Sequence, residues 1–366
     1  MYIKEICLKN FRNYTEAKIS LSDKTNIIYG LNAQGKTNIL EAMYLFSTGR
    51  SHRKASVSEF IKQGENFCEI NLDFESYNRS FEGNLRIFED KKKFLKINGA
   101  EIKKISEISN YINVVMFAPE DLFIIKGFPS ERRRFCDMAI SQVKPVYINL
   151  LNNYIKTISE RNSLLKEISR SGRGEEMLDV WDETLADLSS KIAFYRYEFI
   201  EKIKSYLYEI YNEISMENVK MKYICSFCED FKDISDLKKK ALEKLFISRK
   251  RDIDLGATTS GIHKDDYLFF IDKKEVRKFA SQGQQRSLIL SLKLAQAEYI
   301  NEIKNDYPII LLDDIASELD EKRRSYLKGR IKDKQVIITC TDKEESIALK
   351  DRVKYFLVSN GSVTED

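Results

Sequence analysis

The 366-residue sequence lacks any run of roughly 18 or more apolar residues, and its N-terminus, MYIKEICLKN, has no hydrophobic signal-peptide region. We therefore expect a cytoplasmic protein with no membrane partner. The net charge is only +4 although 32% of the residues are charged, so the total charge does not identify a partner. An apolar share of 43% in a chain of this length is enough for a buried core and two or three domains.

Histidine is scarce in this chain, and its cysteines are scattered. The only histidines are His52 and His263, and no second cysteine pair lies near the single C-x-x-C motif, Cys225 to Cys228. A structural zinc site normally needs such a pair or two nearby histidines, so buried or half-buried thiols are favoured, with zinc or redox chemistry as the alternative. Six cysteines spread through a long charged chain indicate reduced thiols, and we expect no disulfides.

Segment 30–37, G-L-N-A-Q-G-K-T, carries the most specific motif of the chain. It has the G-x-x-x-x-G-K-[ST] pattern of a phosphate-binding P-loop (Walker A), and it stands between a strand pattern and a helical pattern. Gly30 and Gly35 permit the backbone geometry in which N–H groups and a helix N-terminus point at phosphates. Lys36 would reach the β- and γ-phosphates, and the Thr37 hydroxyl would bind Mg²⁺. An ordinary turn with an exposed lysine is the alternative. The expected nucleotide-contacting residues are Gly30, Asn32, Ala33, Gln34, Gly35, Lys36, Thr37 and Asn38.

The sequence predicts one α/β head assembled from both ends of the chain and interrupted by a helical domain. We place the head at residues 1–128 and 251–366 and the helical insertion at 129–250. Pro145 breaks or kinks the first of two long helical stretches in the insertion. Strand patterns fall at 2–11, 16–21, 25–29, 67–74, 80–88, 94–97, 114–117, 308–312 and 336–339. Helical patterns fall at 38–43, 130–168, 175–214, 284–303 and 321–331.

Residues 308–314, P-I-I-L-L-D-D, have the form of a Walker B strand, in which a buried apolar run ends in acids. Ligands of an open parallel sheet bind at the carboxyl ends of its strands. Asp313 would hold Mg²⁺ directly or through water, and Asp314 would orient or activate the attacking water. With Lys36 these acids form the expected catalytic set, and Thr37 and Asp313 form the expected metal site. The alternative is a strand end capped by two solvated acids.

A third segment, 281–287 (S-Q-G-Q-Q-R-S), stands before an apolar helix, and on its own it is typical of a helix cap. The acidic segment 317–320 (S-E-L-D) follows the Walker B acids directly. P-loop, capped signature helix, Walker B and acidic loop occur in the order used by ABC-type ATPases, which this sequence resembles. The resemblance implies a head-to-head dimer in which Ser281, Gly283 and Gln284 contact ATP held by the opposite subunit. Contacts from a helix N-terminus to phosphate give that arrangement a physical basis.

Several longer strings are similar to those of the RecF family of bacterial DNA repair ATPases, and the similarity covers the whole chain. They are N-A-Q-G-K-T-N (32–38), S-H-R (51–53), P-S-E-R-R-R-F (129–135), G-I-H-K-D-D (261–266), S-Q-G-Q-Q-R-S (281–287) and L-L-D-D-I-A-S-E-L-D (311–320). The chain departs from the family pattern at Ile262, Lys264 and Cys136, none of which belongs to the expected phosphate site. The resemblance implies an ABC-type ATPase head, with a P-loop α/β core and an antiparallel β subdomain, plus an inserted helical domain.

The same resemblance implies what the protein does. It would bind ATP and Mg²⁺, form an ATP-dependent homodimer on double-stranded DNA near single-strand gaps, and cooperate with RecR and RecO to place RecA. ATP hydrolysis would be weak, DNA-stimulated and used as a switch. Many related ATPases carry glutamate at the position of Asp314, and the shorter side chain favours slow turnover. The alternatives are a structural DNA tether of the SMC type, with the insertion as its arm, and a transporter subunit.

Several assignments stay open in the sequence. Lysine and arginine bind DNA phosphates irrespective of base sequence, but each basic run alone is typical of a solvated face. The runs expected to bind DNA are Arg132, Arg133 and Arg134, and Lys91, Lys92 and Lys93. Two further runs are 238–240 and 249–251. Segment 50–53 could line the nucleotide or the DNA surface, and the switch residue after the last strand is Thr339 or Thr341.

Overall fold

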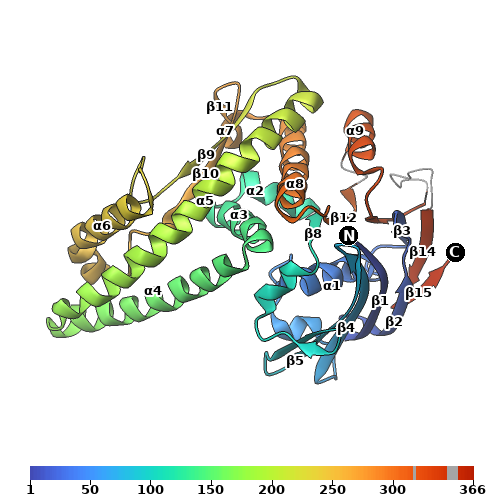
Figure 1. Ribbon diagram of the computed structural model, residues 1–366, viewed down its shortest axis with the longest axis horizontal. Helices are drawn as coiled ribbons and strands as arrows, with labels where there is room; N and C mark the ends of the chain where they lie inside the picture. The colour runs from blue at the N-terminus through green and yellow to red at the C-terminus, as the bar shows by residue number, and fades with distance from the viewer. Residues whose placement is uncertain (316–318, 344–352) are drawn as a thin grey trace. The chain divides into compact units, whose positions relative to one another are not determined.

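The computed structural model describes residues 1–315, 319–343 and 353–366 (Figure 1). Its contacts divide the chain into two compact units, which we call the head and the arm. The head consists of residues 1–122, 210–216 and 282–366, and the arm consists of residues 123–209 and 217–281. No helix in the described part of the chain is long and apolar enough to cross a membrane.

The division by contacts differs from the sequence-based bounds at residues 123–128 and 251–281, which the contacts place with the arm, and at residues 210–216, which they place with the head. Strand pairing draws residues 251–281 to the arm, because β10 (Asp266–Ile271) pairs antiparallel with β9 (Val219–Ile224). Both divisions assemble the head from the two ends of the chain and interrupt it with a largely helical segment.

The first sheet of the head is antiparallel and forms the expected β subdomain. Its order is β2-β1-β4-β5-β6-β7. The strands are β1 (Tyr2–Phe11), β2 (Tyr14–Ser20), β4 (Phe67–Ser76), β5 (Arg79–Phe88), β6 (Lys93–Ile97) and β7 (Ala100–Glu101). The register aligns Leu8 with Ile70, and Ile70 with Leu85, so that apolar side chains share the buried face. The opposite face is polar, as the alternating sequence pattern predicts.

The second sheet of the head is mainly parallel, in the order β15-β14-β3-β13-β12-β8. Its strands are β3 (Thr25–Tyr29), β8 (Val114–Phe117), β12 (Ile309–Asp313), β13 (Val336–Cys340), β14 (Val353–Ser359) and β15 (Ser362–Glu365). Strand β3, from the beginning of the chain, lies between β13 and β14, from its end. All residues of β12 and β13 are buried, which explains their continuous apolar sequences.

Helices position the ends of these parallel strands. The head contains α1 (Lys36–Thr48), α8 (Gln282–Lys304), α9 (Glu321–Ile331) and the short turns η1 (Val57–Phe60), η2 (Ile105–Asn110) and η3 (Pro119–Leu122). Because β3, β12 and β13 are parallel, their carboxyl ends meet at one edge of the sheet. The P-loop follows β3 and the Walker B acids stand at the end of β12, so the fold brings the two predicted motifs together.

The arm is mostly helical, as predicted, and also contains a small sheet of order β11-β10-β9. Its helices are α2 (Phe123–Lys126), α3 (Pro129–Val143), α4 (Pro145–Ser171), α5 (Leu178–Ser215), α6 (Ile234–Leu255) and α7 (Val276–Phe279), with turns η4 (Glu175–Met177) and η5 (Ile262–Lys264) and strand β11 (Lys274–Glu275). Pro145 separates α3 from α4, because its ring cannot continue a helix. The last turns of α5, residues 210–215, belong to the head. Helix α6 and strand β9 were not predicted from the sequence.

Two fully buried arginines hold the arm together. The Arg161 guanidinium bonds to carboxylates of Asp182 on α5 and Asp252 on α6, both at 2.7 Å. Arg196 on α5 bonds to Asp265 at 2.7 Å and to Asp137 on α3 at 3.1 Å. A buried ion pair adds little net stability, but removing one partner leaves an uncompensated charge. These pairs therefore fix which helix faces meet.

Candidate nucleotide-binding site

The two P-loop glycines occupy positions that only glycine can take. Gly30 has φ 145°, and a Cβ there would lie 2.4 Å from the carbonyl oxygen of Val358. Gly35 has φ 114°, and its Cβ would lie 2.6 Å from the Asn13 side chain. Both φ values fall where side chains cause strain, so the motif glycines are required by backbone geometry and close packing.

The turn between β1 and β2 braces the P-loop. The Asn13 amide donates to the Gln34 carbonyl at 2.9 Å, and the Tyr14 hydroxyl donates to the Gly35 carbonyl at 3.1 Å. The Asn38 amide donates to Asn13 at 2.8 Å. Burial raises the pKa of Tyr14, which keeps its hydroxyl protonated as a donor. No local sequence pattern marked Asn13 or Tyr14, because their role depends on a contact between segments 21 residues apart.

Lys36 is buried, and its ammonium lies inside the loop. It donates to the carbonyl oxygens of Gly30 at 2.7 Å and Leu31 at 3.1 Å. Asn32 and Ala33 are exposed, and Ala33 has a positive φ of 64°. The structure thus gathers the predicted residues into one loop, with backbone groups and one cation available to an anion.

Helix α1 is fixed behind this loop by a buried acid. Arg12 donates to both carboxylate oxygens of Glu41 at 3.0 Å each, and the Ser51 hydroxyl donates to the same carboxylate at 2.9 Å. Such bidentate pairing is geometrically specific. Arg12 and Glu41 lie outside the motif, and the sequence did not single them out.

The Walker A threonine meets the Walker B acid. The Thr37 hydroxyl donates to the Asp313 carboxylate at 2.8 Å, and the Thr339 hydroxyl donates to the same oxygen at 2.8 Å. Thr339 also accepts from the backbone N–H of Asp314 at 3.0 Å. Thr339, one of the two residues left open for the switch, therefore contacts both Walker B residues.

These oxygens fit a magnesium ion, which takes hydroxyl and carboxylate ligands in nucleotide sites. Burial raises the pKa of Asp313, and the hydroxyls of Thr339 and Thr37 oppose that shift. A bound divalent cation would favour the ionised carboxylate. The donor set that the sequence assigned to the metal, Thr37 and Asp313, is thus geometrically consistent with it.

Two cationic side chains of the head lie near carboxylates on or close to the Walker B strand. The Arg53 guanidinium lies 4.0 Å from Asp313 and 4.0 Å from Glu120, so part of segment 50–53 lies beside the Walker B acid. Deeper in the head, Lys293 on α8 pairs with buried Asp121 at 2.9 Å. Burial opposes ionisation of Asp121, but the Lys293 ammonium and the His52 ring outweigh it and lower its pKa.

The signature helix begins earlier than its sequence suggested. Helix α8 starts at Gln282, two residues before the predicted start at Gln284, so Gly283 and Gln284 both lie in its first turn, and Ser281 is exposed directly ahead of it. Arg323 on α9 donates to the Gly283 carbonyl at 2.9 Å and to the Ser287 hydroxyl at 2.8 Å.

The acidic segment that follows Walker B is only partly described. Ser317 and Glu318 lie outside the described residues. Asp320 caps α9 by accepting from the Arg323 backbone N–H at 2.9 Å. Arg323 therefore links this cap to the signature segment, and the sequence did not single it out.

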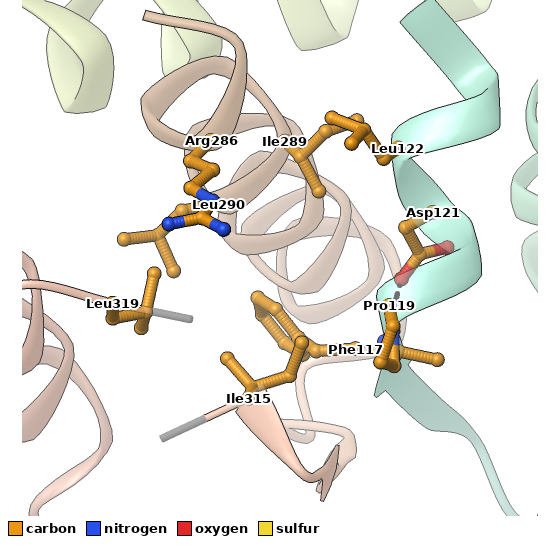
Figure 2. Close-up of a pocket in the computed structure, with 10 residues that line it drawn as sticks. Phe117, Pro119, Asp121, Leu122, Arg286, Ile289, Leu290, Ile315 and Leu319 are labelled. Carbon is orange, nitrogen blue, oxygen red and sulfur yellow. Dashed lines mark hydrogen bonds between the residues drawn. The ribbon is translucent and has the colours of Figure 1, made fainter. Parts of the chain in front are cut away.

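An apolar pocket lies beside the signature helix in the head (Figure 2). Ile289 and Leu290 project from α8 towards Leu122, Phe117 and Ile315. The full lining is Phe117, Ala118, Pro119, Asp121, Leu122, Arg286, Ile289, Leu290, Ile315 and Leu319. These contacts join the carboxyl ends of β8 and β12 to α8, so the signature helix packs on the same strands that carry the site.

The basic runs expected to bind DNA are partly engaged within the protein. Lys93 donates to the Gly49 carbonyl at 2.9 Å, and burial lowers its pKa, while Lys92 pairs with Asp90 at 2.7 Å. DNA contact by segment 91–93 stays a prediction, and Lys91 and Lys92 are both exposed.

The arginine run of the arm is engaged as well. Arg132 is buried and bonds to Asp266 at 2.7 Å, and Arg133 donates to the Asp265 carbonyl at 2.7 Å. A role of Arg132, Arg133 and Arg134 in DNA binding likewise stays a prediction. The ion pair explains why arginine stands near a helix N-terminus, where the dipole disfavours positive charge.

The C-x-x-C motif forms a close pair of free thiols. The two sulfur atoms of Cys225 and Cys228 lie 3.7 Å apart. Hydrogen bonding to Cys228 and burial raise the pKa of Cys225, whereas hydrogen bonding to Cys225 lowers that of Cys228. Among the described residues, no group of three or more histidine, cysteine, aspartate or glutamate side chains is arranged to hold a metal ion.

The head has the fold and motif arrangement of the ABC-type ATPases, in the form found in SMC heads. A solved Smc head domain from Pyrococcus furiosus shares the fold, with a TM-score of 0.56 at 18% identity over 100% of this chain and 96% of that one. The family model for the RecF/RecN/SMC N-terminal domain matches residues 2–364. This chain belongs to the RecF family.

Individual relatives support that membership over the full length. The DNA replication and repair protein RecF of Lachnospira eligens is 41% identical, covering 100% of both chains. The RecF of Bacillus cereus strain G9842 is 41% identical over 99% of this chain and 98% of its own. A solved structure of the recombination mediator protein RecF with ATP, in the RecFOR pathway, has a TM-score of 0.94 at 35% identity, covering 100% of this chain and 97% of that one.

Proposed function

We propose that this protein is an ATP-gated DNA-binding protein of replication and recombinational repair. The observation that carries the proposal is the hydrogen bond from the Thr37 hydroxyl to the Asp313 carboxylate, which joins the Walker B acid to a P-loop whose two motif glycines are required by the backbone. That arrangement suits a nucleotide with its magnesium ion, and full-length relatives named for DNA replication and repair supply the context. A relative solved with ATP supports ATP as the nucleotide.

In the proposed cycle ATP closes two copies of the chain head to head. Ser281, Gly283 and Gln284 of one copy complete the phosphate site of the other, where backbone groups at the start of α8 stabilise the γ-phosphate charge. Lys36 neutralises phosphate charge, and Asp314 orients the attacking water. The short side chain of Asp314 makes turnover slow, so ATP acts as a timer for the closed state.

The closed dimer would bind duplex DNA near single-strand gaps, and hydrolysis would release it. Basic side chains supply an affinity that falls with salt and ignores base sequence. Cooperation with RecR and RecO in placing RecA completes the proposal, supported by the solved relative described within the RecFOR pathway.

The test is to compare the parent protein with Lys36→Met in sedimentation velocity and duplex-binding assays, with and without ATP. The parent should shift from monomer to dimer with ATP and bind duplex more tightly, while the variant should do neither. Lys9→Met, which removes an exposed lysine from the β subdomain, is the matched control and should behave as the parent. ATP-dependent dimerisation of Lys36→Met at parental strength would refute the proposal.

A further inference from the structure

We propose that the arm carries a binding site for the unstacked bases of single-stranded DNA, built from the side chains of Phe123, Phe128 and Phe279. The inference rests on the proposed function in DNA metabolism and adds a site to it. These rings are exposed by 59%, 74% and 68% respectively, although phenylalanine is normally buried. Large apolar side chains that are exposed on adjoining elements are typical of a binding surface.

The three rings come from neighbouring elements of the arm. Phe123 begins α2, Phe279 ends α7, and these two helices are in contact. Phe128 directly precedes α3, which contacts α2. We call this set of three side chains the aromatic patch.

A backbone hydrogen bond closes the turn between Phe123 and Phe128. The Gly127 N–H donates to the Phe123 carbonyl at 2.8 Å. A Cβ on Gly127 would lie 2.5 Å from that same oxygen, so only glycine closes this turn. The spacing of Phe123 and Phe128 is therefore set by the backbone.

Buried Arg132 connects the segment that carries Phe123 and Phe128 to the segment that carries Phe279. It donates to the Gly127 carbonyl at 3.1 Å and binds both carboxylate oxygens of Asp266 at 2.7 and 2.9 Å. Asp266 begins β10, which pairs with β11, and β11 leads directly into α7 and Phe279. A patch held this way is preorganised, so a ligand loses little free energy in ordering it.

The charges around the rings select a polyanion. Segment 273–279 contains four cations and one acid, and Lys126 adds a cation beside Phe123. Lys278 pairs with Glu275 at 2.8 Å, whereas Lys273, Lys274 and Arg277 are exposed. Cations interleaved with aromatic rings are the combination that binds single-stranded nucleic acid, with bases stacked on the rings and phosphates on the cations. Duplex DNA hides its base faces, so unstacked bases fit this surface better.

The test uses nucleotide-free protein and oligothymidylate of about 16 nucleotides, a length within the range that single-strand binding folds cover. The triple variant Phe123→Ala, Phe128→Ala, Phe279→Ala should bind about tenfold or more weakly, since stacking on even one ring contributes that much. Phe246→Ala is the matched control, because Phe246 is 65% exposed on α6, away from the patch residues in sequence, and should bind as the parent.

A second set of variants separates stacking from plain apolar contact. With oligonucleotides carrying 2-aminopurine, the parent should change the fluorescence of the probe base by stacking on it, and a triple Phe→Leu variant should not. Parental affinity in the triple Ala variant, or parental fluorescence changes in the triple Leu variant, would overturn the site. Loss of self-association with unchanged oligonucleotide affinity would instead make the patch a contact between copies. Failure of the proposed ATP gate would appear separately, as parental behaviour of Lys36→Met.

Discussion

Arg323 holds the signature segment (residues 281–287) through side-chain hydrogen bonds, and replacing it tests what that segment does. Its guanidinium reaches the Gly283 carbonyl and the Ser287 hydroxyl, and it also pairs with Asp320. The side chain of Asp320 is 56% exposed, so that ion pair contributes little. The other two bonds come from a cationic donor, and removing them costs about 2 kcal/mol after allowance for the partly exposed guanidinium.

If the signature segment completes a site in the opposite copy, this loss falls mainly on the closed dimer. Arg323→Ala should raise the ATP-dependent dimer dissociation constant roughly 30-fold, the factor that corresponds to about 2 kcal/mol. ATP binding by the monomer should change by less than about twofold, because Lys36 and Thr37 keep their contacts.

The assay is sedimentation equilibrium with ATP over a range of protein concentrations, beside calorimetric ATP binding by dilute monomer. Lys322→Ala removes the neighbouring exposed lysine of α9 and serves as control. Arg323→Lys keeps the charge but loses the forked geometry, so it should recover only part of the dimer affinity. Parental dimerisation by Arg323→Ala, or an equal loss in monomer ATP binding, would refute the reasoning.

Two further changes test the head. Gly35→Ala should weaken ATP binding roughly 100-fold in calorimetry, since its Cβ would lie 2.6 Å from the Asn13 side chain at a φ of 114°. The control is Gly329→Ala, where a Cβ meets open space, and this variant should bind ATP as the parent does. Asp121→Asn breaks the buried pair with Lys293 and should lower the free energy of unfolding by about 3 kcal/mol at pH 7. Because the folded-state pKa of Asp121 is lowered, its stabilisation is present above the unfolded carboxyl value of about 3.9 and is lost as the pH falls through the folded-state value. Urea unfolding should therefore show the two proteins converging below about pH 4, and a constant difference would contradict the ion pair as the cause.

The sequence was most informative where a local pattern determines the element. Strands β3 and β8 and helix α9 have the predicted bounds, because each combines a clear apolar pattern with a clear start or stop signal. Helix α6 and strand β9 were missed although their patterns are present: residues 219–224 (VKMKYI) alternate apolar and polar side chains, and apolar residues recur at helical spacing at 234, 237, 241 and 245.

Contacts distant in the sequence could not be predicted. The Asn13 brace on the P-loop and the Arg323 bonds to the signature segment join elements whose closeness follows from the tertiary fold. The sequence marked Arg132 as unusual at a helix start, but its partner Asp266 lies 134 residues away. Local patterns carry no information about such pairs, so their roles emerge only from the structure.

A mixing experiment tests the central claim, that ATP is held between two copies of this chain, most directly. Lys36→Met removes the P-loop cation of one copy, and Ser281→Arg blocks the signature of the other, so each variant alone should lack ATP turnover. In a mixed dimer one site combines an intact P-loop from the Ser281→Arg copy with an intact signature from the Lys36→Met copy. We predict that mixing the two purified variants restores turnover. Continued inactivity of the mixture, or turnover by the Ser281→Arg variant alone as a monomer, would contradict the account.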